Sequence, residues 1–151
     1  SPLGWVGRDH RKLLAVDGRV GSVSGVCVSA KWLGDAAHGV APWRDSGLLI
    51  EGPAVRSIEA AFRDSWGGLG DPLPFDPAPE PAACGEVALR IIATQPAHGA
   101  MFRLDSLIAG MATESLWISD AYFVGIPTYV QALAAAVTDG VDVRLLVPGS
   151  N

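Results

Sequence analysis

GRDHRKLLAVDGRVGSVSG, residues 7–25, contains two short β-like runs joined by a turn. The runs LLAVD and VGSVSG meet at Asp17-Gly18, a dipeptide typical of tight hairpin turns because both positions tolerate a positive φ. Residues 47–51, GLLIE, form another apolar run of strand length. The sequence therefore predicts a β-hairpin close to residue 20 and a further strand at 47–51.

A helix is predicted directly after that strand. Within residues 52–68, Pro53 occupies a first helical position and Gly67 lies just past the expected end. Four apolar side chains recur at helical spacing and would form one face of this helix: Val55, Ile58, Phe62 and Trp66.

Residues 71–86 are rich in proline, which disfavours both helix and sheet and is typical of an extended connector. This segment predicts three parts: a first domain over 1–70, a linker over 71–86 and a second domain over 87–151.

Strands and helices alternate after the predicted linker. The apolar patterns predict strands at 87–94, 116–123 and 141–147, separated by helices at 101–115 and 127–140. Such alternation is typical of parallel strands joined by helical crossovers. The expected fold class is α/β, with a mixed or parallel sheet flanked by helices. The chain stops soon after its last strand, where another element would normally follow, so we expect a truncation.

The bulk composition limits the classes of function. With 151 residues, 49% hydrophobic and 18% charged, the chain is long and apolar enough for a packed core. Its net charge of −5 argues against non-specific binding of nucleic acid. No apolar run is long enough to span a membrane, and the first residues lack the features of a signal peptide. Cys27 and Cys84 show no metal-ligand spacing, so neither a metal nor a cofactor is predicted.

His10 and Lys12 are the residues that most suggest chemistry. In an extended segment, side chains two residues apart point to the same side. An imidazole beside an ammonium suits attack on a phosphate, with the histidine as nucleophile and the lysine holding an oxygen. Asp17 has the opposite parity and lies in the predicted turn, which gives it a structural role. The alternative is a surface histidine beside a lysine that protects an edge strand from aggregation.

The flanking sequence extends this motif. RDHRKLLAVDGRVGSVSGVCVS, residues 8–29, and PWRDSGLLIEGPAVRSIEAAFRDSW, residues 42–66, together resemble the first H-K-D region of the phospholipase D superfamily. The resemblance is strongest to bacterial members of the cardiolipin synthase type. LWISDAYFVGIP, residues 116–127, and GVDVRLLVPG, residues 140–149, are similar to the start of the family's second half. The resemblance covers nearly the whole chain and implies an incomplete α-β-α sandwich.

The resemblance implies cleavage of a phosphodiester in two steps through a covalent phosphohistidine. His10 would be the nucleophile, or the acid/base that serves its counterpart, and Lys12 would grip the phosphate. Asp17, the third residue of the motif, would be structural. Asp45 would be a buried acid that holds the other ring nitrogen of the histidine. The implied substrate is a phosphatidyl group, the acceptor is water or an alcohol, and the implied location is cytoplasmic with peripheral membrane contact.

Further residues are implied to contact the substrate. Ser24-Gly25 preserves the family's small pair, which lets the backbone approach the phosphate. Cys27 stands where the family has an asparagine, and a thiol is a weak donor. This departure implies a weakened site, unless Ser29 or a backbone N–H substitutes or Cys27 is simply a small buried residue. Tyr122 resembles an aromatic residue at the mouth of the family's site, with core packing as the alternative.

A second H-x-K-x4-D motif is absent from the sequence, since neither His38 nor His98 has a lysine two residues on. The family builds its active site from two such motifs. We therefore expect the second half-site to come from missing sequence or from a homodimer, and the isolated chain to be inactive. Two alternatives stay open: a single-motif phosphodiesterase that cuts nucleic acid as a homodimer, and a degenerate module that binds phosphate without chemistry.

Overall fold

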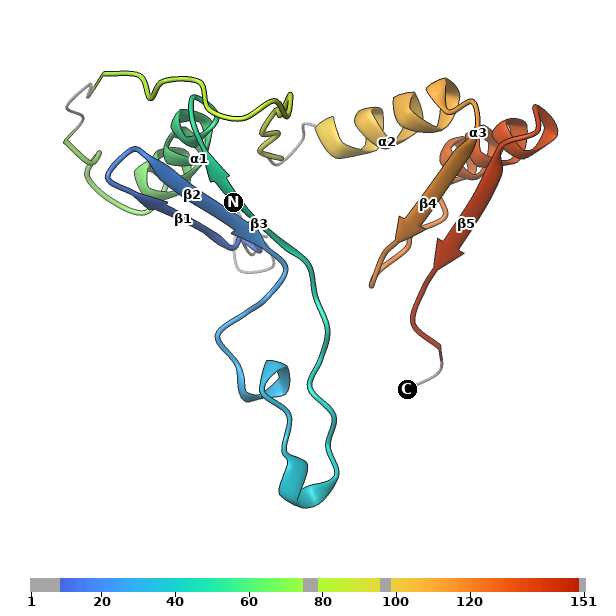
Figure 1. Ribbon diagram of the computed structural model, residues 1–151, viewed down its shortest axis with the longest axis horizontal. Coiled ribbons are helices and arrows are strands. Elements are labelled where there is room, and N and C mark those ends of the chain that lie inside the picture. The colour runs from blue at the N-terminus through green and yellow to red at the C-terminus, as the bar shows by residue number, and fades with distance from the viewer. Residues whose placement is uncertain (1–8, 75–78, 96–98, 150–151) are drawn as a thin grey trace, which may run out of the picture. The chain divides into compact units, whose positions relative to one another are not determined.

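The computed structural model describes residues 9–74, 79–95 and 99–149 (Figure 1). Contacts divide the chain into two compact units, Ser1–Ile91 and Ile92–Asn151. The first unit contains an antiparallel sheet and the second a parallel pair of strands, and helices pack in both. The predicted mixed α/β class is confirmed, whereas the linker over 71–86 stays a prediction.

The sheet of the first unit has three antiparallel strands in the order β1-β2-β3. They are β1 (Leu13–Val16), β2 (Val20–Ser24) and β3 (Gly47–Glu51). The predicted hairpin is confirmed, because Asp17 and Gly18 both have a positive φ, 54° and 64°, in the turn between β1 and β2. This turn fixes the register, in which Leu13 lies opposite Val23.

Helix α1 (Val55–Gly67) lies against one face of this sheet (Figure 1). It begins two residues after Pro53, and Gly67 is its last residue. Val55 and Ile58 are fully buried and form a core with Ile50 of β3. The backbone of β2 comes close to the helix at Gly21, where an added Cβ would overlap the end of the Ile58 side chain.

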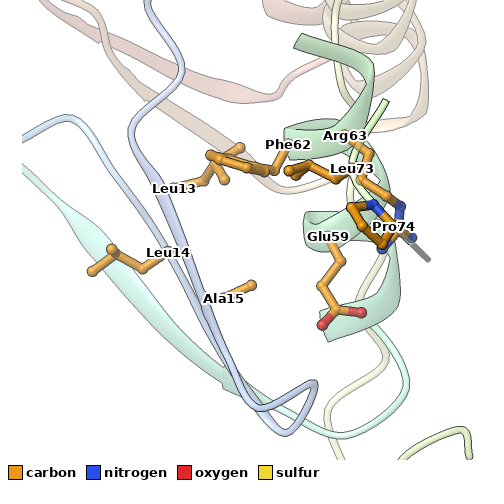
Figure 2. A pocket seen from close by; sticks show the side chains of 8 residues that line it. All are labelled: Leu13, Leu14, Ala15, Glu59, Phe62, Arg63, Leu73 and Pro74. Carbon is orange, nitrogen blue, oxygen red and sulfur yellow. The ribbon is translucent and has the colours of Figure 1, made fainter. Parts of the chain in front are cut away.

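The C-terminal half of α1 is less buried than the helical spacing of its apolar residues predicts. Phe62 and Trp66 are partly exposed and stack on each other, with 5.9 Å between their ring centroids. A pocket of about 300 Å³ is lined by residues of β1 and α1, and Figure 2 shows the Phe62 side chain extending toward Leu13. The opposite face of the sheet carries exposed apolar side chains: Leu14, Val16 and Leu49.

The strand predicted at 87–94 is wrong, because the structure forms no strand there. Val87 is 85% exposed, whereas Ile91 packs against the core of the first unit. An apolar run becomes a strand only where another strand is available to pair with it. Here the run contributes one side chain, Ile91, to the core between a sheet and a helix.

The second unit follows the predicted alternation. Its elements are α2 (Ala100–Met111), β4 (Ser115–Ser119), α3 (Pro127–Thr138) and β5 (Asp142–Leu146). Strands β4 and β5 pair in parallel, as predicted. Helix α2 ends earlier than expected, because Ala112 adopts extended backbone. No helix in the described part of the chain combines the length and apolar character needed to cross a bilayer.

Candidate functional site

The pairing of the first sheet continues beyond the ends of its strands. Ser24 N donates to the carbonyl oxygen of Lys12, and Gly25 N donates to that of Ser46, each at 3.0 Å. The segment before β1, the segment after β2 and the segment before β3 therefore lie side by side at one end of the sheet. Three of the predicted site residues, Lys12, Ser24 and Gly25, meet there.

Asp45 joins this end of the sheet through a close contact with Gly25. A Cβ atom added to Gly25 would overlap the Asp45 carboxylate, so only glycine allows this approach. Ser46 N donates to Asp45 Oδ1 at 2.8 Å and thereby orients the carboxylate. Asp45 is exposed and not buried, and the structure records no hydrogen bond between it and His10, both of which it describes. Its role toward the imidazole stays a prediction.

His10 and Lys12 differ in their surroundings. His10 is exposed, whereas Lys12 is half-buried and its Nζ donates to the His10 carbonyl oxygen at 2.6 Å. An ammonium carries three donors, so this bond leaves two with which Lys12 can hold an anion.

A pocket of about 600 Å³ opens beside Lys12. Ser24 and Cys27, two of the predicted substrate-binding residues, line it together with Lys12, and Val26 and Val28 give it an apolar part. This volume is typical of sites for small organic ligands. The Cys27 thiol, a weak donor, donates to the Gly25 carbonyl oxygen at 4.0 Å.

Two charged residues that the sequence prediction missed flank His10. Arg11 forms an ion pair with Asp9, and Asp9 also accepts a hydrogen bond from the Ser65 hydroxyl on α1. The Ser65 hydroxyl, followed by the guanidinium and amide of Arg11, lowers the pKa of Asp9 from 3.8 to about 2. The sequence does contain a signal for this pair. In an extended segment, Asp9 and Arg11 alternate with His10 and Lys12, so the two pairs point to opposite sides.

Two other predicted site residues lie elsewhere. Asp17 is in the hairpin turn, at the opposite end of β1 from Lys12. Tyr122 belongs to the second unit, where it is 86% exposed and its N–H donates to Asp120 Oδ1 at 2.8 Å. Within the described residues, no three His, Cys, Asp or Glu side chains are grouped so that they could hold a metal ion.

Comparison with known proteins connects this geometry to one group of enzymes. Cardiolipin synthase A of Pseudomonas aeruginosa (strain LESB58) is 38% identical to the chain over 146 residues, which cover 93% of the chain and 29% of that protein. Cardiolipin synthase A of Pseudomonas fluorescens (strain SBW25) is 34% identical over 155 residues, or 96% of the chain and 32% of that protein. The enzyme of the same name from Pseudomonas putida (strain F1) is 32% identical over 145 residues.

No protein-family model matches the chain, and no solved structure matches it. The chain spans about 30% of the length of the curated relatives named above. Over nearly all of its own length, the chain is therefore similar to a part of bacterial cardiolipin synthases.

Proposed function

We propose that the chain forms part of a phospholipase D-like phosphatidyltransferase of the cardiolipin synthase type, acting on a phosphatidyl group. The observation that carries the proposal is the convergence of Lys12, Ser24, Gly25 and Asp45 at the end of the sheet where the His10 segment lies. The similarity to cardiolipin synthase A supports the choice of a phospholipid as substrate.

In the proposed first step, a ring nitrogen of His10 attacks the phosphorus atom of a phosphatidyl ester. A P–N bond forms, the P–O bond to the leaving alkoxide breaks, and the alkoxide takes a proton from an acid and leaves as the alcohol. In the second step, the hydroxyl of an acceptor alcohol, or water, loses a proton to a base and attacks the phosphorus, which releases His10. The acid and the base belong to a second half-site, supplied by further sequence or by a second copy of the chain.

Lys12 is proposed to stabilise the negative charge on the non-bridging phosphate oxygens. Its ammonium keeps two donors after bonding to the His10 carbonyl oxygen, and it lines the pocket in which the phosphate would sit. A charged donor aimed at developing charge typically contributes a factor of about 100 to 1,000 in rate.

Gly25 and Asp45 are proposed to act as a unit. Because Gly25 has no side chain, the Asp45 carboxylate can lie directly against its backbone. Asp45 Oδ1 is engaged by the Ser46 N–H, so Oδ2 is the oxygen that would accept the His10 ring N–H. Such a bond would fix the tautomer that leaves the attacking nitrogen unprotonated.

Replacement of His10 tests this proposal. In the complete protein, His10→Ala should lower phosphatidyl transfer from a short-chain phosphatidylglycerol by at least about 10³-fold, because the nucleophile is lost. His38→Ala is the matched control, since His38 is an exposed histidine paired with Asp35. When reactions with labelled substrate are stopped with detergent at alkaline pH, which preserves the acid-labile P–N bond, label should remain on a histidine of the wild-type protein and of His38→Ala, but not of His10→Ala. Undiminished transfer by His10→Ala would end the proposal.

The weak thiol donor at Cys27 favours one alternative, a module that binds phosphate without chemistry. That function predicts saturable binding of the same lipid, weakened by Lys12→Ala, with no transfer and no trapped phosphohistidine in the complete protein. Restoring an amide with Cys27→Asn should raise the transfer rate if the site is catalytic but weakened.

A further inference from the structure

The motif segment is tied to helix α1 by the two charged residues on either side of His10. We propose that Asp9 and Arg11 are positioning residues, which hold His10 and Lys12 in place for phosphoryl transfer. This inference rests on the proposed function of His10 and Lys12.

The side chains of Arg11 and Asp9 contact each other through several pairs of atoms. Arg11 Nη2 lies 2.9 Å from Asp9 Oδ2, and Arg11 Nε lies 3.0 Å and 3.1 Å from the two carboxylate oxygens. The planar fork of a guanidinium fits a carboxylate in this way and restricts the orientation of both side chains. An ammonium has no such fork, so lysine at position 11 would keep the charge and lose the geometry.

Each member of the pair also bonds to α1. The Ser65 hydroxyl donates to Asp9 Oδ2, and Arg11 Nη1 donates to the Ala61 carbonyl oxygen at 3.3 Å. Ala61 and Ser65 are four residues apart and so lie on the same face of the helix. Ala61 is itself buried, and it stands one turn beyond Ile58 of the core. The pair therefore connects the motif segment to the helix that packs on the core of the unit.

The backbone around His10 is held by the same group of side chains. Asp9 Oδ1 accepts a hydrogen bond from the Arg11 N–H at 2.9 Å, so the carboxylate bridges across His10. The His10 carbonyl oxygen in turn accepts from Lys12 Nζ at 2.6 Å. Both polar atoms of the peptide group between His10 and Arg11 are thus held by side chains. A displacement of about 1 Å in a reacting group can lower a rate by about 100-fold.

The experiment measures the effect of Asp9→Asn in the complete protein, well below the unfolding temperature. Asp71→Asn is the matched control, because it is the same chemical change elsewhere in the first unit. Asp9→Asn should lower kcat for transfer from short-chain phosphatidylglycerol about 10- to 100-fold, and Arg11→Lys should do the same. Ser65→Ala should cause a smaller loss, which Ser65→Thr restores because it keeps the hydroxyl. Ser57→Ala, on the same helix, should leave kcat unchanged.

Hydrogen exchange separates positioning from a general loss of stability. In Asp9→Asn, amides of residues 10–12 should exchange faster, while those of α1 keep their wild-type rates. An unchanged kcat would overturn the inference, and so would a lowered kcat with unchanged exchange at residues 10–12. Because hydrogen exchange needs no turnover, it tests the contacts of Asp9 and Arg11 with α1 separately from the proposed function. Failure of the proposed function would show as wild-type transfer in His10→Ala.

Discussion

The two units of the chain are built around different kinds of buried residue. In the first unit, branched side chains fill the space between an antiparallel sheet and one helix: Ile50, Val55 and Ile58. In the second unit, two of the four buried apolar residues described are alanines, and all four lie among two helices and a parallel pair of strands: Ala109, Leu133, Ala136 and Val141.

The units also differ in what their topology brings together. The antiparallel sheet of the first unit places the segments next to Lys12, Gly25 and Asp45 at one end, although they are distant in the sequence. In the second unit, β4 and β5 run in parallel and are joined through α3 alone. An antiparallel sheet can therefore bring distant side chains together at one site when a long excursion, here residues 25–46, connects two of its strands.

The largest effect is expected from truncating the core of the first unit. Ile58→Ala should lower the free energy of unfolding by about 3–4 kcal/mol, because a fully buried side chain is replaced by a cavity. Leu133→Ala in the second unit should cost less, about 2–3 kcal/mol, since Leu133 is 9% exposed. Hydrogen exchange measured peptide by peptide should show Ile58→Ala opening the first unit only. Equal opening of both would show that the two units unfold as one.

A smaller effect is expected at the sheet end that holds the site. Gly25→Ala should lower the free energy of unfolding by about 1–3 kcal/mol, because its methyl group would displace the Asp45 carboxylate. Gly67→Ala is the control, since an added Cβ there meets no atom within 4 Å. Urea unfolding measures both variants. If Gly25→Ala matches Gly67→Ala, the contact with Asp45 does not constrain this end of the sheet.

The smallest effect is expected in the free energy of unfolding at low pH. Folding lowers the pKa of Asp9 from 3.8 to about 2, so the folded state binds a proton there less readily than the unfolded state. The stabilisation is therefore complete above about pH 4 and is lost as the pH falls toward 2. Solvent screening of this partly exposed group limits it to less than about 1 kcal/mol. Urea unfolding between pH 2 and 5 measures this effect. As the pH falls, the free energy of unfolding should decrease less in Asp9→Asn than in the wild type.

Much of the fold was predictable because its signals are local. Asp17-Gly18 requires the turn that both residues adopt with positive φ, and the spacing of Val55 and Ile58 identified the buried face of α1. The same holds for β4 and β5, whose parallel pairing follows from the helix between them. In each case the determining residues are close in sequence to the element that they specify.

The rest depended on contacts between distant residues. The pattern of 87–94 could not show that Ile91 would pack on the core of the first unit instead of in a sheet. Asp9 and Arg11 look like ordinary solvated charges until Ser65, far along the chain, is placed beside them. Gly25 and Asp45 likewise gain their meaning only from the pairing of the segments that they occupy.

The excursion between β2 and β3 extends away from the sheet and returns to it (Figure 1), and the hydrogen bond from Gly25 N to Ser46 O closes its base. Doubling the length of such a closed loop costs only about 0.6 kcal/mol in chain entropy. Evolution or protein engineering can therefore lengthen, shorten or replace the interior of this excursion while Lys12 and Asp45 keep their places. Loop exchange would then change residues that line the pocket beside Lys12, while the paired end of the sheet is retained.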